Sequence, residues 1–167
     1  MILICLLCFL TAAARMDLRT NKIGNRLIGI GLFFGYMRNL VEYGWNGSIH
    51  FLIQISLPVC IFYLLFLMRA LGAGDIKLFS VISSCIGIKN LFQVVIFSFL
   101  IGAVLSCIVL FRNRNLYGRL YYFSCYVRTA LLTKSIANYD YQSDGKQNYI
   151  HFSVPILIGY VMYLGGM

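Results

Sequence analysis

Long apolar runs alternate with shorter polar segments along most of the sequence. The runs cover residues 1–16, 26–41, 49–69, 76–89, 91–111 and 152–165. Their apolar residues are largely consecutive, whereas a membrane β-barrel needs apolar and polar positions that alternate within segments of about ten residues. The pattern therefore predicts an all-α fold, namely a polytopic membrane protein with a bundle of about six transmembrane helices.

The composition agrees with a membrane location. Of the 167 residues, 60% are hydrophobic and 11% are charged, whereas soluble domains carry about 25% charged residues. At about 20 residues per crossing, this length accommodates roughly six crossings, so we expect residues 1–167 to form a single domain. The composition excludes an ordinary soluble globule, a disordered chain and a small disulfide-rich scaffold.

The cysteines do not indicate a metal site. Five of the six lie in apolar runs, where we expect them to be small buried hydrophobic residues. Cys5 and Cys8 form a C-x-x-C pair, but no second pair or nearby histidine completes a set of four zinc ligands. There is no glycine-rich phosphate-binding motif either, so the sequence predicts no metal and no cofactor.

The positive charges indicate the orientation in the bilayer. If every run crosses, the loops on one side are 15–26, 69–77 and 112–151, and those on the other side are 38–50 and 89–90. The first set holds twelve Lys and Arg residues and the second holds two, so the first set should face the cytoplasm. The net charge of +9 is thus explained by a lipid bilayer as partner, without nucleic acid. The long basic loop, 112–151, fits either an amphipathic helix on the inner surface or a solvated loop.

Small residues and one proline predict packing features within the bundle. Gly31 and Gly35 form a small-xxx-small pair, and Ser98, Gly102 and Ser106 repeat this spacing in the fifth run. Such faces allow helices to approach closely. Pro58 lies inside the third run and should kink it.

Two of the five acidic residues are candidates for chemistry. Asp140 and Asp144 belong to the long polar loop, and Glu42 follows Arg38 by four residues, which predicts a local ion pair. Asp17 and Asp75 each abut an apolar run, where a carboxylate is costly and therefore a functional candidate.

The expected topology brings Asp17 and Asp75 to the same side of the membrane, because two crossings separate them. Two neighbouring carboxyls in a medium of low dielectric constant cannot both ionise, so one retains a proton near neutral pH. Such a pair supplies the general acid and the general base for peptide hydrolysis without a metal or a covalent intermediate.

Each of these residues also has a structural interpretation. Asp75 could be the N-cap of the fourth helix, and Asp17 could be neutralised by Arg15 or Arg19. Gly72 and Gly74 could allow close approach of an extended substrate or simply form a turn. Lys77 is expected to reach toward lipid headgroups rather than to carry protons.

Two motifs resemble the type IV prepilin peptidases, which are GxGD aspartic proteases of the bacterial inner membrane. The segment Gly72-Ala73-Gly74-Asp75-Ile76-Lys77-Leu78 resembles their G-x-G-D-x-K-L motif. Asp17 with Ile23-Gly24-Asn25 resembles their second motif, an aspartate followed seven and eight positions later by Pro-Asn.

The resemblance implies that Asp17 and Asp75 are the catalytic dyad, supported by Gly72, Gly74, Lys77 and Asn25. The implied activity is a multi-pass membrane aspartic endopeptidase that cleaves the short basic leader of a pilin-like precursor at the cytoplasmic face. Gly24 departs from the family pattern, because it replaces the usual proline. The cysteine-containing N-terminal region of long members is not found here, so the resemblance is to the short form, and methyltransferase activity is not implied.

Two alternatives remain open. A proton- or cation-coupled transporter could use the paired carboxylates to bind a cation. A non-enzymatic assembly subunit of a pilus or secretion machine would need neither aspartate. No feature of the sequence indicates an oligomeric state.

Overall fold

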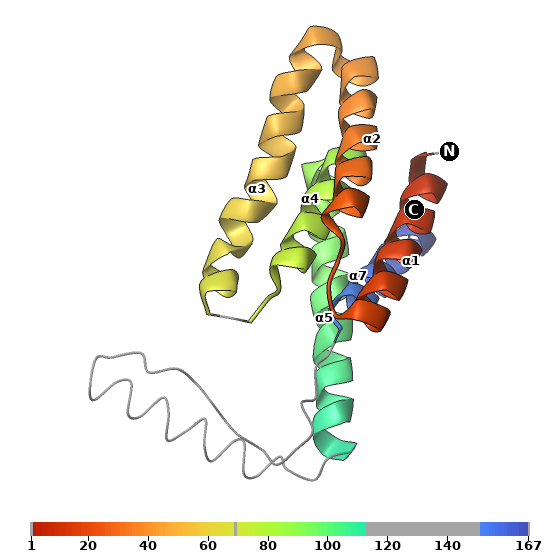
Figure 1. Ribbon diagram of the computed structural model, residues 1–167, viewed down its shortest axis with the longest axis vertical. Coiled ribbons are helices and arrows are strands. Elements are labelled where there is room, and N and C mark those ends of the chain that lie inside the picture. Colours follow the sequence, from red (N-terminus) through yellow and green to blue (C-terminus); the bar gives the residue numbers. More distant parts are fainter. Residues whose placement is uncertain (1, 69, 113–150, 167) are drawn as a thin grey trace, which may run out of the picture. The chain divides into compact units, whose positions relative to one another are not determined.

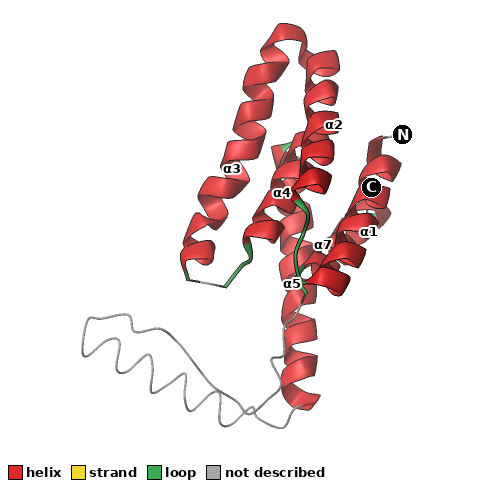
Figure 2. Cartoon of the chain, in the orientation of Figure 1, coloured by secondary structure: helices red, strands yellow, loops and turns green. Residues whose placement is uncertain are grey.

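The computed structural model describes residues 2–68, 70–112 and 151–166, and it is helical throughout apart from turns and short connections (Figures 1 and 2). The helices are α1 (Ile2–Thr20), α2 (Asn25–Tyr43), α3 (Gly47–Leu67), α4 (Ala73–Ile86), α5 (Ile88–Arg112) and α7 (Ser153–Gly165). A short 3-10 helix, η1 (Gly44–Asn46), connects α2 to α3. The all-α prediction is therefore confirmed for these residues.

Each α-helix coincides with one of the apolar runs, but the α-helices differ from one another in length. Two helical stretches of the described residues are long and apolar enough to cross a membrane, Asn25–Leu67 and Ile88–Val109. The first stretch contains both α2 and α3, which run in opposite directions (Figure 1). At a rise of about 1.5 Å per residue, α4 and α7 are only about 20 Å long, shorter than a hydrocarbon core of about 30 Å. A bundle of six crossing helices stays a prediction.

The chain divides into two compact units, residues 1–102 with 151–167 and residues 103–150. Of the second unit, the structure describes residues 103–112, at the end of α5. The prediction for loop 112–151 falls almost wholly outside the described residues. The single domain expected over residues 1–167 also stays a prediction, and all candidate site residues belong to the first unit.

The core of the first unit forms around α4. Ten of its fourteen residues are buried, including every position from Leu78 to Ile86. A helix that is apolar on all sides is stable only when other helices surround it, and α1, α2 and α3 all contact α4. In contrast, α2 and α3 leave many large apolar side chains exposed, such as Phe34 and Leu64. Exposed apolar faces of this extent fit lipid contact.

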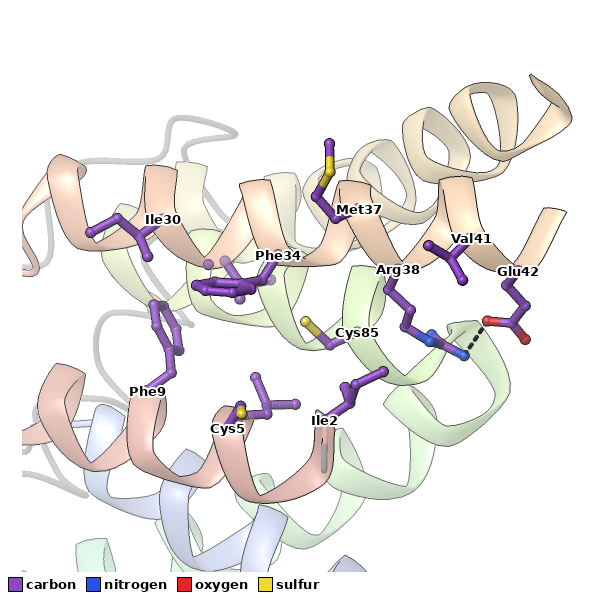
Figure 3. Close-up of a pocket in the computed structure, with 13 residues that line it drawn as sticks. Ile2, Cys5, Phe9, Ile30, Phe34, Met37, Arg38, Val41, Glu42 and Cys85 are labelled. Atoms are coloured by element: carbon purple, nitrogen blue, oxygen red, sulfur yellow. Dashed lines mark ion pairs between the residues drawn. The ribbon is translucent and has the colours of Figure 1, made fainter. Parts of the chain in front are cut away.

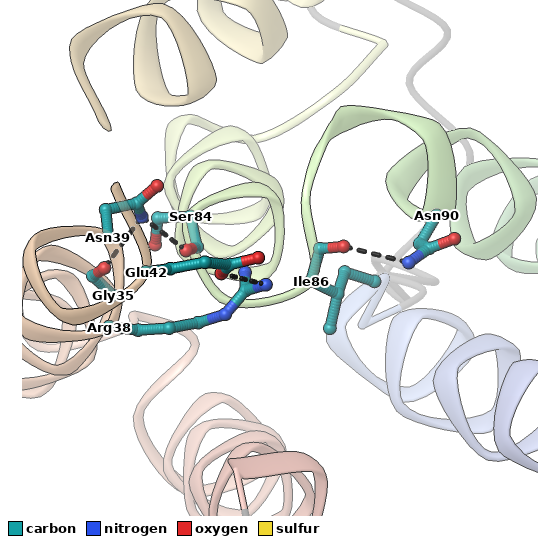
Figure 4. A network of polar contacts seen from close by, with 7 residues as sticks. All are labelled: Gly35, Arg38, Asn39, Glu42, Ser84, Ile86 and Asn90. Carbon is teal, nitrogen blue, oxygen red and sulfur yellow. Dashed lines mark hydrogen bonds and ion pairs between the residues drawn. The ribbon is translucent and has the colours of Figure 1, made fainter. Parts of the chain in front are cut away.

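Close packing between α2 and α4 depends on the predicted glycine face (Figure 4). A Cβ atom at Gly31 would lie 2.7 Å from Val81 Cγ1, and one at Gly35 would overlap the Ser84 hydroxyl. Asn39 is fully buried, and its Nδ2 donates hydrogen bonds to the carbonyls of Gly35 (2.8 Å) and Ser84 (3.0 Å). The prediction of a close-packing face is therefore confirmed for α2.

A second close contact involves α5 and α7. A Cβ at Gly159 would lie 2.5 Å from the Ser98 hydroxyl, and one at Gly102 would lie 2.8 Å from the Phe152 ring. The expected packing role of Ser98 and Gly102 is thus confirmed. The same helix, α7, is joined to α1 by Tyr160, whose hydroxyl donates to the Leu3 carbonyl at 3.0 Å.

Two expectations need a different account. Cys85 is buried as expected, but Cys5, Cys8, Cys60 and Cys107 are exposed on helix surfaces, so the prediction that they are buried was wrong. Apolar character indicates contact with a nonpolar medium, and in a membrane protein that medium can be lipid as well as protein. The expected kink at Pro58 stays a prediction, since α3 continues through this residue.

Candidate active site

Asp17 lies in the last turn of α1. The helix ends at Thr20, whose hydroxyl donates to the carbonyls of Met16 (2.9 Å) and Lys22 (2.8 Å). Asn21 follows with a φ of +52°, in the left-handed region that asparagine tolerates. These local features reverse the chain between α1 and α2 directly after Asp17.

The Asp17 carboxylate contacts the beginning of α7. Ser153 Oγ donates a hydrogen bond of 2.6 Å to Asp17 Oδ2, and His151 Nδ1 lies 3.4 Å from the same oxygen. The only other ion pair in the described ranges joins Arg38 and Glu42, so neither Arg15 nor Arg19 neutralises Asp17. That structural interpretation of Asp17 was wrong, because side chains 134 and more residues away take the place of its sequence neighbours.

Asp75 lies in the first turn of α4, and Gly72 rather than Asp75 is the N-cap. The expectation of Asp75 as an N-cap was therefore wrong. The aspartate stands three residues beyond the cap, where the backbone N–H of Gly72 stabilises its charged form. A Cβ atom at Gly72 would lie 3.1 Å from Asp75 Oδ2. A larger residue at position 72 would therefore crowd the Asp75 carboxylate.

The surroundings of Asp75 favour its protonated form. Asp75 lies in the first turn of α4, directly before the apolar run 76–89. Burial raises the pKa of its carboxyl to about 6, with a further increase from the charge of Asp17, against opposing effects of the Gly72 amide and of His151. The charges of Asp17 and His151 thus both act on the Asp75 carboxyl, and the pairing of the two aspartates in one catalytic site stays a prediction.

The remaining supporting residues connect α4 to α2 near the same end. Lys77 Nζ donates a hydrogen bond of 2.8 Å to Asn25 Oδ1, so Lys77 is engaged with protein rather than reaching toward lipid. A Cβ at Gly74 would lie 3.1 Å from Ile23 Cδ1. The two motifs, distant in sequence, therefore contact each other through Asn25 with Lys77 and Ile23 with Gly74.

Gly24 is the N-cap of α2 and has an extended conformation, with φ −66° and ψ 130°. These angles are available to proline, so the backbone here matches the residue that the resemblance expects. The available space is small, because a Cβ at this position would lie 2.7 Å from Met16 Cε. The flexible end of the Met16 side chain fills the volume beside Gly24.

His151 and Ser153 were not among the predicted site residues. The topology had placed residue 151 on the same side as Asp17, but several other polar residues of the long loop share that side. Only the folded chain selects these two, since the packing of α7 against α1 brings them to Asp17. A polar residue at the first turn of an apolar helix, such as Ser153, was the available signal.

An apolar cavity lies between α1, α2 and α4, away from the aspartates (Figure 3). Its volume is about 800 Å³. Its lining includes Ile2 and Phe9 from the first half of α1 and Phe34 from α2, and its charged members, Arg38 and Glu42, form an ion pair of 2.7 Å. The predicted local ion pair is thus confirmed, and the cavity offers apolar volume but no unpaired acid.

The residues that the structure describes contain no group of three or more His, Cys, Asp or Glu arranged to hold a metal ion. A protein-family model described as the type IV leader peptidase family matches residues 4–107. No curated protein and no solved structure matches the chain. The matched segment contains Asp17 and Asp75 and ends before His151 and Ser153.

Proposed function

The chain belongs to the type IV leader peptidase family and is therefore an aspartic-type endopeptidase, and we propose that it removes the short basic leader of a pilin-like precursor through Asp17 and Asp75. The observation that carries this proposal is the unequal electrostatic environment of the two carboxyls. Asp75 is held toward its protonated form, with the charge of Asp17 as one cause. Asp17 accepts a hydrogen bond from Ser153.

This asymmetry supports a division of roles in hydrolysis. The ionised Asp17 takes a proton from a water molecule, whose oxygen attacks the carbonyl carbon of the scissile peptide bond. Asp75 donates its proton to the carbonyl oxygen, which gives a neutral tetrahedral intermediate. Collapse of this intermediate transfers a proton to the leaving nitrogen and breaks the C–N bond. Gly72, Gly74, Lys77 and Asn25 would position Asp75 and the turn that follows Asp17.

The substrate and location follow from the membrane setting of the site. Apolar helices and the family indicate a membrane protein, and we place it in the bacterial cytoplasmic membrane with the aspartates near the cytoplasmic face. That face carries the basic loops. A precursor whose basic leader stays in the cytoplasm and whose apolar segment enters the bilayer would present the peptide bond between them at this depth.

The test is cleavage of a model precursor with a short basic leader joined to an apolar helix. The full chain and its Asp17→Asn and Asp75→Asn variants are each expressed with this precursor, and the leader is followed by immunoblot. We expect the native chain to remove the leader and both variants to leave it attached. Normal processing by either variant, at equal enzyme abundance, would exclude the aspartate mechanism. The transporter alternative predicts ion flux in reconstituted vesicles without any cleavage.

A further inference from the structure

The start of α7 supplies Asp17 with two polar partners that lie outside the family-matched segment. Ser153 is 2% exposed, and its hydroxyl donates to Asp17 Oδ2 at 2.6 Å. This distance is in the range of about 2.5–2.7 Å that is typical of a hydroxyl bonded to a charged oxygen. His151 Nδ1 lies 3.4 Å from the same oxygen. A carboxylate that accepts such contacts is favoured in its ionised form.

Within the described residues, few other charged side chains are placed to act on this carboxylate. The helices that pack most extensively against α1 are α2, α4 and α7, and α7 holds no charged side chain. The remaining charged residues of these elements and of the turn after α1 are Asp75 and Lys77 of α4, Arg26, Arg38 and Glu42 of α2, Arg15 and Arg19 of α1, and Lys22. Lys77 is bonded to Asn25, and Arg38 is paired with Glu42. Arg15, Arg19, Lys22 and Arg26 are exposed to solvent or headgroups, where their charges are screened.

We propose that His151 and Ser153 are positioning residues that hold Asp17 as the ionised, water-activating member of the pair and leave Asp75 as the proton donor. This inference rests on the proposed function. Burial and the charge of Asp17 already raise the pKa of Asp75, and the two partners add to this preference by acting on the other carboxyl. The Ser153 hydroxyl proton and the nearby imidazole stabilise negative charge on Asp17, so the proton resides on Asp75.

Ser153 contributes the larger share of this effect, because its hydrogen bond is short and buried. His151 is 25% exposed at its side chain and lies beyond ordinary hydrogen-bond distance from Asp17. Its influence also extends to Asp75, whose pKa it lowers. The histidine therefore acts on both carboxyls, whereas the serine acts on Asp17 alone.

The test is the pH dependence of kcat/KM for the purified full chain in detergent, where both sides of the protein are exposed to the same buffer pH. The substrate is the model precursor with a basic leader and an apolar helix. In Ser153→Ala we expect cleavage at neutral pH to fall by roughly ten- to a hundredfold. The acidic limb should move to higher pH, because the base loses the donor that favours its ionised form. His151→Gln should shift the acidic limb in the same direction by less, and the basic limb slightly upward.

Matched controls separate this role from a loss of structure. Ser98 is also buried, but its hydroxyl donates to the Val94 carbonyl of its own helix at 2.6 Å, so Ser98→Ala should retain the native pH profile. His50 stacks on Tyr43 beside the connection between α2 and α3, so His50→Gln should also leave the profile unchanged. Ser153→Thr keeps the hydroxyl and should recover the position of the acidic limb.

The outcomes distinguish the inference from the function on which it rests. A rate that falls equally at every pH in Ser153→Ala, or an unshifted profile in both variants, would overturn the positioning role while cleavage by the native chain continued to depend on Asp17 and Asp75. Cleavage that survives Asp17→Asn would instead overturn the proposed function itself. The His151→Gln profile remains informative if Ser153→Ala fails to fold, because His151 is partly exposed.

Discussion

The two ends of α1 lie in different surroundings. At its C-terminal end, Asp17 is in contact with Ser153 and His151 and shares an electrostatic environment with Asp75. In its first half, Ile2 and Phe9 line an apolar cavity of about 800 Å³. An acid is found near the cavity as well, but Glu42 is neutralised by Arg38 four residues earlier in the same helix.

This difference shows what separates a chemically competent acid from a structural one. A local ion pair within one helix gives its acid a charged partner and requires no other element of the fold. Asp17 and Asp75 instead come from different helices, and neither has an arginine or lysine as a direct partner within the described residues. Burial and the charge of Asp17 raise the pKa of Asp75 to about 6, so Asp75 holds a proton at pH values where an ordinary aspartate is ionised, which favours acid–base chemistry.

The largest expected effect compares the acids at the two ends. Asp75→Asn should lower the rate of precursor cleavage by about 10²–10⁴-fold, because it removes the proton donor. Glu42→Gln should leave the rate within about twofold, since a partly exposed ion pair contributes roughly 0–1 kcal/mol to stability and nothing to the reaction. Single-turnover cleavage in detergent measures both. Equal loss in the two variants would show that the comparison between the ends is wrong.

A smaller effect is expected from the packing that keeps α1, α2 and α4 together. Gly31→Leu should destabilise the protein by about 1–3 kcal/mol, because even a Cβ at this position would lie 2.7 Å from Val81 and 2.8 Å from the Phe9 ring. Gly29→Leu is the matched control in the same helix, where a Cβ meets no atom within 4 Å. Thermal unfolding in detergent should separate the two variants. Similar melting temperatures would contradict the close approach of these helices.

The smallest effect concerns the pH dependence of stability. The pKa of Asp75 is about 6 in the folded chain against an ordinary value of 3.8, so between these values the folded state binds more protons than the unfolded state. Stability from this group is therefore full below pH 3.8 and decreases as the pH rises to about 6. Asp75→Asn should abolish this decrease and raise Tm by a few degrees above pH 6, at about 2–4 °C per kcal/mol. If the Tm of the native chain and that of Asp75→Asn differed by the same amount at about pH 3.5 and at about pH 7, a raised pKa of Asp75 would be excluded.

Much of the fold could be predicted from the linear pattern. Each apolar run contains a helix, because consecutive apolar residues in a membrane protein have to satisfy their backbone hydrogen bonds within the segment. The pattern could not show that α4 lies at the centre of its unit or that Cys5, Cys8 and Cys60 are exposed. An apolar side chain is equally compatible with a protein core and with lipid, so its burial depends on which helices pack around it.

The candidate site was likewise only partly predictable from the sequence. Asp17 and Asp75 could be identified from the sequence, because acids beside apolar runs are rare and costly and because counting crossings places both at one end. Only the tertiary structure decided their partners. His151 and Ser153 approach Asp17 across 134 and 136 residues, and Lys77 meets Asn25 across 52. Such contacts depend on the rotation and depth of packed helices, which no local pattern encodes, whereas the cost of a charge beside hydrocarbon is a property of the residue itself.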